Sequence, residues 1–264
     1  MRGSSTPPSG ILATAAGRAR QAAPALDIST DLPVCAPAAA LIGASHDAGL
    51  LVVGHRGLGG FTGLLVGSVG VQVAAHAVCP VVVVRDSDAV EPGPAAGEVL
   101  VGVDGSVGVD GSPLSSLAVD FAFAHAAQHG LSVTALHVYQ RPEFTVPIDL
   151  PIPVPGGEDR RDYEARLLTD ALAGCIEKYP DVPVHRKIVV GRPSAVLAKS
   201  AGAALTVVGS RGRGGFAGLL LGSTSQTVLH HATGPVVIVR AAPPARGTQP
   251  PERAGLRDAP DPTP

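Results

Sequence analysis

The residues best suited to chemistry in this chain are glycines placed at fixed intervals before a serine. From residue 209 the chain reads Gly209-x2-Gly212-x9-Gly222-Ser223, and Thr224 follows. Because glycine has no Cβ, it lets backbone amides approach a ligand closely. A serine at the start of a helix adds a hydroxyl to the free N–H groups and the positive end of the helix dipole. The pattern therefore predicts an anion site of the kind that binds phosphate.

The same pattern stands earlier in the chain. Residues 50–85 align without a gap onto residues 205–240, and 22 of the 36 aligned pairs are identical. Solenoid and propeller repeats recur every ~20–50 residues, whereas these two blocks lie 155 residues apart. The spacing therefore predicts a duplicated domain, and the first copy carries its own loop, Gly54-x2-Gly57-x9-Gly67-Ser68.

Two other interpretations of the glycines fail. A P-loop requires Gly-Lys-Ser/Thr, but the pair Lys199-Ser200 follows an alanine. A dinucleotide fingerprint requires an acidic residue about 20 positions after its glycines, but residues 182–251 contain no Asp or Glu. Eight Lys and Arg residues fall in that stretch, so the second loop should lie in a positive potential that suits a polyphosphate. Arg211 and Arg213 are the candidates to steer or clamp it.

Together these motifs resemble the universal stress protein family. They are the glycine loops, the closing run Pro-Val-Val-Ile-Val from residue 235, and an upstream Val-Gly-Val-Asp-Gly-Ser. The resemblance covers nearly all of residues 98–240 and, more loosely, residues 10–85. It implies an α/β fold of tandem parallel-sheet domains, of the adenine nucleotide alpha hydrolase-like type. It also implies ATP as the ligand, alone or with Mg²⁺.

The resemblance further implies where the adenosine end of the nucleotide binds. The family's contacts fall on the Asp of Val-Gly-Val-Asp-Gly-Ser and on a backbone group of Val138. Because that hexapeptide occurs twice in tandem, two aspartates compete for the role. Asp104 has the right distance from the start of the strand, and Asp110 has the right distance to the next helix. Both Asp-Gly-Ser units also suit a turn or an N-cap that binds nothing.

Strands and helices alternate through the second copy. The patterns predict strands at 98–104, 131–139 and 182–190 and helices at 113–129, 158–178 and 193–203, before the repeated block adds strand, helix and strand. Such alternation predicts a parallel sheet with right-handed crossovers. Ligands in these sheets bind outside the carboxyl ends of the strands at the switch point, where the first and fourth strands should meet.

The first copy is incomplete. Counting back from its loop, the patterns predict a strand at 50–53, a helix at 37–46, a strand at 26–34 and a helical remnant at 10–23. Nothing upstream can serve as the first two strands, so the prediction is a partial domain at 10–85 and a complete one at 98–240. Either the gene product begins further upstream, or the first copy is a degenerate half held by its partner.

The last strands of the two copies should pair. Residues 81–84 and 236–239 are short, apolar and terminal in their units, so each forms an edge that invites another strand. We expect antiparallel contact, within the chain or in a homodimer. The remaining segments are predicted as a linker at 86–97 and as disorder at 1–9 and in the proline-rich tail at 241–264.

Composition narrows the class of partner. The net charge of −2 and the 3% aromatic content without Trp argue against a nucleic-acid binder. No run of 18 apolar residues suggests a membrane span, so we expect a cytoplasmic protein. No metal site is expected, because His125 and His129 lack the glutamate of a zincin motif. Cys35, Cys79 and Cys175 are interpreted as buried, reduced thiols.

The sequence therefore predicts a tandem protein that binds ATP in its second domain and acts as a nucleotide-responsive stress or regulatory protein. Two alternatives remain, a dimeric adaptor that binds no nucleotide and a slow ATP hydrolase. The hydrolase lacks a candidate base, because His55 of the first loop is Ser210 in the second and no glutamate stands nearby. No catalytic residue and no protein partner is predicted.

Overall fold

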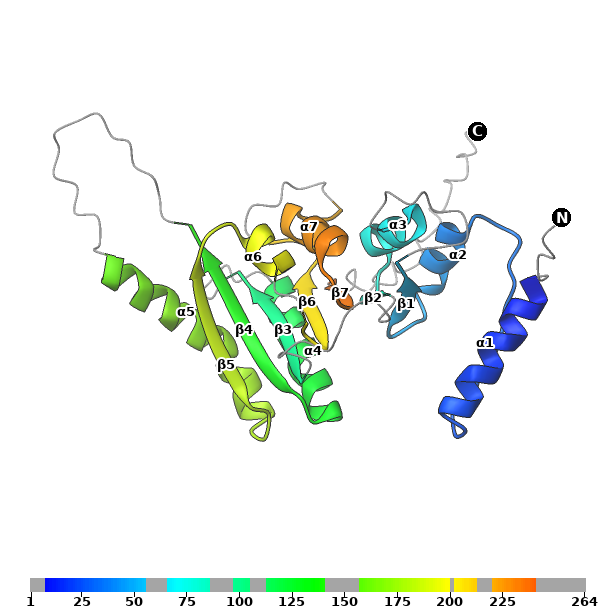
Figure 1. Ribbon diagram of the computed structural model, residues 1–264, viewed down its shortest axis with the longest axis horizontal. Helices are drawn as coiled ribbons and strands as arrows, with labels where there is room; N and C mark the ends of the chain where they lie inside the picture. The colour runs from blue at the N-terminus through cyan, green and yellow to red at the C-terminus, as the bar shows by residue number, and fades with distance from the viewer. Residues whose placement is uncertain are drawn as a thin grey trace, which may run out of the picture.

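A computed structural model describes residues 8–55, 66–85, 97–104, 113–140, 157–199, 202–212 and 220–240. Within them one seven-stranded sheet, in the order β1-β2-β7-β6-β3-β4-β5, is covered by helices on both faces (Figure 1). The predicted linker, the tail and most of the predicted N-terminal disorder lie outside these residues. The elements are α1 Pro8–Ala22, α2 Pro37–Ala44, β1 Leu51–Gly54, α3 Ser68–His76, β2 Val81–Val84, β3 Glu98–Val103, α4 Pro113–His129, β4 Ser132–Tyr139, α5 Gly157–Lys178, β5 Val184–Val190, α6 Pro193–Lys199, β6 Leu205–Gly209, α7 Ser223–His231 and β7 Val236–Val239.

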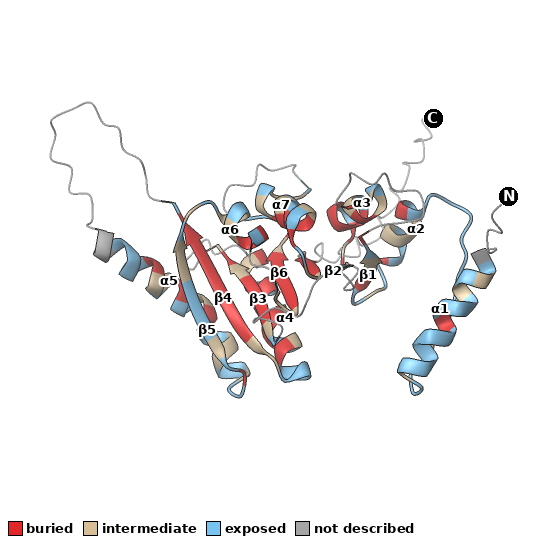
Figure 2. Ribbon diagram, viewed as in Figure 1, coloured by how far each residue is buried: buried red, intermediate tan, exposed pale blue. Residues whose placement is uncertain are grey.

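The second copy forms the complete parallel unit that its sequence predicts. β3 is hydrogen bonded to β4 on one side and to β6 on the other, and β5 and β7 extend the sheet on either side, all in parallel. Side chains alternate between the two faces, as the period of a strand requires. On one face α4 and α5 pack over β3, β4 and β6, and on the other face α6 and α7 do so. Figure 2 shows β3, β4 and β6 buried between these layers.

The two copies join through their last strands. β2 pairs antiparallel with β7, with Val81 opposite Ile238 and Val83 opposite Val236. The predicted pairing of the fifth strands is therefore confirmed, and it occurs within the chain. Val81, Val83, Val236 and Ile238 are fully buried at this joint under α3 and α7.

Two arginines reinforce the joint about a pseudo-twofold axis. Arg85 donates from Nη2 to the carbonyl of Leu229, and Arg240 donates from Nη1 to the carbonyl of Ala74 at 3.0 Å. Arg85 is the repeat equivalent of Arg240, and Ala74 is the repeat equivalent of Leu229. Both carbonyls lie in the last turn of a helix, where they have no partner inside the helix. Each copy therefore caps a helix of the other.

The first copy contributes two strands, and the predicted strand at 26–34 is wrong. The segment has no strand or helix geometry, and Leu26, Leu32 and Val34 are exposed. Its counterpart in the second copy is β5, which is hydrogen bonded to β4. The first copy has no equivalent of β4 in the described chain, so the segment lacks the ladder that would fix it as a strand. α1 stands apart from the sheet and is largely exposed (Figures 1 and 2).

Identical residues in the two copies differ sharply in burial. Val52 on β1 is 59% exposed, whereas its equivalent Val207 on β6 is 0% exposed. Val84 is likewise 39% exposed against 3% for Val239. The difference has one cause, because α4 covers β6 and β7 and no described helix covers β1 and β2 on that face.

This contrast predicts unequal costs for one substitution. Val207→Ala should lower the free energy of unfolding by about 2 kcal/mol, because it removes buried methyl groups and leaves a cavity under α4. Val52→Ala should cost under about 0.5 kcal/mol, since its side chain already contacts solvent. Urea unfolding of the two variants measures both values. Equal losses would mean that the first copy is covered in solution.

The missing ladder predicts an exchange pattern. Backbone amides of residues 27–34 should exchange with deuterium nearly as fast as those of a free peptide, because no strand pairs with them. Amides of β5, the equivalent segment in the second copy, should be protected through their bonds to β4. Hydrogen–deuterium exchange followed by mass spectrometry compares the two segments in one experiment. Protection at 27–34 would contradict the assignment.

Candidate functional site

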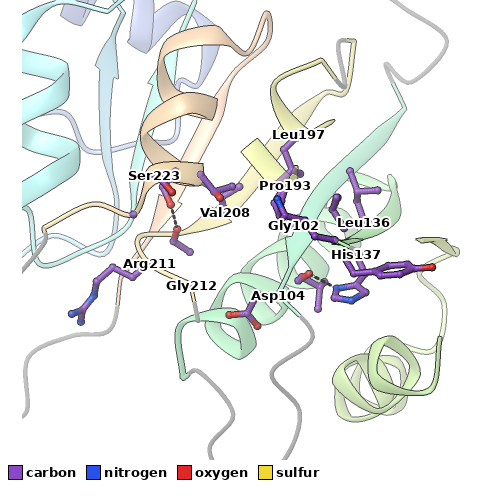
Figure 3. A pocket seen from close by; sticks show the side chains of 18 of the residues that line it. Gly102, Asp104, Leu136, His137, Pro193, Leu197, Val208, Arg211, Gly212 and Ser223 are labelled. Carbon is purple, nitrogen blue, oxygen red and sulfur yellow. Dashed lines mark hydrogen bonds between the residues drawn. The ribbon is translucent and has the colours of Figure 1, made fainter. Parts of the chain in front are cut away.

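A cavity of about 730 Å³ opens at the carboxyl ends of β3, β4 and β6. Figure 3 shows it between the start of α7, which carries Ser223, and the strand ends, which carry Asp104 and His137. Arg213 and Asp110 lie outside the described residues. All the other predicted site residues line this one cavity, namely Asp104, Val138, Gly209, Arg211, Gly212, Gly222, Ser223 and Thr224.

The glycine loop is held closed by three hydrogen bonds. The amide of Ser210 donates to the carbonyl of Val239 at 2.7 Å, and the amide of Gly222 donates to the carbonyl of Ser210 at 2.8 Å. Ser225 donates from Oγ to the carbonyl of Gly209 at 2.6 Å. These bonds place the start of α7 beside the end of β6.

The first turn of α7 offers backbone donors to the cavity. Gly222 is the N-cap, and its carbonyl accepts from the amide of Gln226 at 2.9 Å. The preceding amides of Ser223, Thr224 and Ser225 have no carbonyl within the helix to receive them. All three residues line the cavity. With the positive end of the helix dipole, they form an anion cradle.

The loop glycines are required by close packing, because their backbone does not adopt positive φ. Among the described residues, positive φ occurs at Gly130 and Gly202. A Cβ on Gly209 would lie 3.2 Å from the carbonyl oxygens of Leu114 and Arg211. One on Gly222 would lie 3.3 Å from Cα of Arg211. A Cβ on Gly212 would meet Oδ2 of Asp104 at an ordinary 3.8 Å, which shows how close the loop lies to β3.

Positive charge gathers beside the loop. Burial, and then the nearby Arg211, lower the pKa of Arg240 from its usual value. Arg240 also donates from Nη1 to the carbonyl of Leu220 at 3.2 Å, so it supports the loop just before Gly222. Arg211 is exposed, and its guanidinium points away from Asp104 and His137 (Figure 3). Arg211 is therefore placed to steer an anion and does not contact the base end of the cavity.

The loop of the first copy has similar hydrogen bonds but no comparable cavity walls. The amide of His55 donates to the carbonyl of Val84 at 2.8 Å, and the amide of Gly67 donates to the carbonyl of His55 at 2.7 Å. The equivalent of Ser225 is Gly70, so the hydroxyl bond to the strand end is lost. Equivalents of β3 and β4, which carry Asp104 and Val138, are absent from the described first copy.

The cavity also contains three residues that the sequence analysis missed. His137 on β4 and Glu164 on α5 are each 2% exposed and lie 2.8 Å apart, from Nε2 to Oε2. Arg160, one turn before Glu164, donates from Nε to Oε1 at 2.7 Å. Two signals could have revealed them. His137 interrupts an apolar strand, and Glu164 begins the helical stripe that continues with the buried Leu168 and Leu172.

Other titratable groups give little to the site. Among the residues that the structure describes, no group of three His, Cys, Asp or Glu could hold a metal ion, and no helix is long and apolar enough to cross a membrane. Cys79 is buried as expected. Cys175 is half-buried, and burial and Asp120 raise its pKa to about 11. The expectation for Cys35 is wrong, because it is exposed in the segment without a strand.

Fold and cavity together define a doubly wound α/β protein, duplicated in part, with a ligand pocket at the carboxyl edge of its sheet. A family model described as the universal stress protein family matches residues 10–85 and 98–240. The chain belongs to this family.

Individual relatives agree. Universal stress protein Rv2005c of Mycobacterium tuberculosis H37Rv is 40% identical over 236 residues, which are 87% of this chain and 76% of the relative. Universal stress protein Rv2623 of the same strain is 41% identical over 210 residues, 77% of this chain and 66% of the relative. A universal stress protein from Archaeoglobus fulgidus superposes with a TM-score of 0.58 at 23% identity, covering 89% of this chain and 77% of that one. That likeness concerns the fold.

The packing of the loop predicts a graded response to alanine. Gly209→Ala should lower the free energy of unfolding by about 1–3 kcal/mol, because the new methyl group would press on two carbonyl oxygens. Gly212→Ala should fold with nearly parental stability, because its methyl group would make an ordinary contact with Asp104. Thermal unfolding separates the two. Equal melting temperatures for all three proteins would show that the loop relaxes around Gly209.

Proposed function

We propose that the cavity of the second copy binds ATP and that the protein is a cytoplasmic, nucleotide-responsive stress or regulatory protein. The observation that carries the proposal is the convergence of three chain segments on one cavity. The glycine loop, the end of β3 with Asp104 and the end of β4 with Val138 all line it. The volume of about 730 Å³ is in the range of small-molecule sites, roughly 300–1,000 Å³.

The phosphates would lie at the start of α7. The amides of Ser223 and Thr224 and the hydroxyl of Ser223 would donate to phosphate oxygens. The bare backbone of Gly222 would permit close approach. Arg211 and Arg240 would raise the local concentration of the anion. Mg²⁺, if it accompanies the nucleotide, would neutralise phosphate charge and would be held chiefly by the phosphates themselves.

The adenosine end would lie at the strand ends. The carboxylate of Asp104 accepts hydrogen bonds and so suits the ribose hydroxyls. The backbone of Val138, at the end of β4, offers an amide and a carbonyl to the edge of the base. This end of the cavity has no counterpart in the described part of the first copy. One ATP per chain is therefore expected.

Paired substitutions in the two loops test the site. Ser223→Ala should weaken ATP binding by about 1.5–3 kcal/mol, because a charge-assisted hydrogen bond is lost. Gly222→Val should abolish binding, because its side chain would fill the cradle beside Arg211. The matched controls Ser68→Ala and Gly67→Val should leave the affinity unchanged. Isothermal titration calorimetry measures both affinity and stoichiometry.

Each other outcome has a defined meaning. Two ATP per chain, or equal losses from both loops, would sink the single-site proposal. A parent protein that binds no ATP would favour the dimeric adaptor. Release of ADP and phosphate during the titration would favour the slow hydrolase.

A further inference from the structure

Both ring nitrogens of His137 are engaged inside the wall of the cavity. Nδ1 lies 2.9 Å from the carbonyl oxygen of Val103, and Nε2 lies 2.8 Å from Oε2 of Glu164. A carbonyl oxygen can only accept, so Nδ1 must carry a hydrogen. One further proton must then lie between Nε2 and the carboxyl group of Glu164. The pair is buried and fully engaged, which makes it rigid.

The contacts of His137 reach both sides of the base end of the cavity. The carbonyl of Val103 belongs to the same peptide plane as the amide of Asp104, so the bond from Nδ1 fixes where Asp104 leaves β3. On the other side, Oε1 of Glu164 accepts from Nε of Arg160 at 2.7 Å. A continuous chain of contacts thus runs from the end of β3, across β4, to the first turns of α5.

Arg160 is the member of this chain that is open to a ligand. It lines the cavity and is 44% exposed, whereas Glu164 is 2% exposed. Because Nε is bound to Glu164, its Nη1 and Nη2 groups remain as donors in a fixed plane. A guanidinium held in this way can stack on a heteroaromatic ring or donate to its edge.

We propose that Arg160 contacts the nucleoside and sets the preference of the site for a base, and that His137 and Glu164 are positioning residues that hold Arg160 and Asp104 in register. The inference rests on the proposed function, because it concerns the same cavity. It assigns the nucleoside end to a contact network separate from the glycine loop. The two ends of the ligand should therefore respond to different substitutions.

The test uses three ligands and three substitutions in the full chain. Calorimetry with ATP, adenosine and inorganic tripolyphosphate separates the two ends of the cavity. Arg160→Leu and Glu164→Leu should each weaken ATP and adenosine about tenfold, as expected for one lost hydrogen-bonding group. Tripolyphosphate should bind within about twofold of the parent, because it contacts only the start of α7.

Glu164→Gln is the conservative variant. Its amide oxygen can accept from Nε of Arg160 while its NH₂ group donates to Nε2 of a neutral His137, so every contact is kept. Adenosine affinity should therefore stay within about twofold of the parent. Glu177→Leu, at an exposed position of the same helix, is the control for the loss of a surface carboxylate from α5.

The outcomes separate this inference from the proposed function. Equal losses for tripolyphosphate and adenosine would mean that the network only supports the fold, which overturns the inference. ATP binding that is insensitive to Arg160→Leu and Glu164→Leu overturns it as well but leaves the proposed function standing. A parent that binds neither ATP nor adenosine overturns both.

Discussion

The pairing of β3 with both β4 and β6 is the constraint on which the rest of the molecule depends. A strand bonded in parallel on both sides must send its crossover helices to opposite faces, so the chain diverges at its carboxyl end. α4 and α5 cover one face, and α6 and α7 cover the other. The gap between them is the cavity. Asp104, Val138 and the glycine loop meet there because their strands are neighbours.

The first copy shows the consequence of losing that strand. Its loop keeps the hydrogen bonds through His55 and Gly67, since these depend only on β1, β2 and α3. It has no second wall, because no described strand occupies the position of β3 beside β1. A phosphate cradle without a base pocket remains open to water, where charged contacts contribute little.

The first copy nevertheless supports the site of the second. Arg240 donates to Ala74 of α3 and to Leu220 of the loop, so one guanidinium spans the two copies. β7 is bonded on one side to β2 and on the other to β6. The carbonyl of its Val239 also accepts from Ser210, the second residue of the loop segment. The strand that anchors the loop is therefore central in the sheet and not at its edge.

Local pattern was enough to predict the elements of the second copy and the glycine loop. Strand period, helix starts and the repeat each depend on residues close in sequence. The strand at 26–34 could not be judged in this way, because a strand exists only with a partner and that partner is absent. His137 and Glu164 were missed for a related reason, since their contact joins a strand to a helix 27 residues later. Neither residue has a distinctive neighbour in sequence.

The antiparallel joint has a consequence for the order in which the chain is made. β2 leaves the ribosome long before β7, and 155 residues separate equivalent positions of the two strands. At a synthesis rate of about 5–20 residues per second, this delay is roughly ten to thirty seconds. During that time a row of valines presents an unpaired edge, which is a template for aggregation. Efficient production of this protein should therefore depend on chaperones that bind short apolar segments during translation.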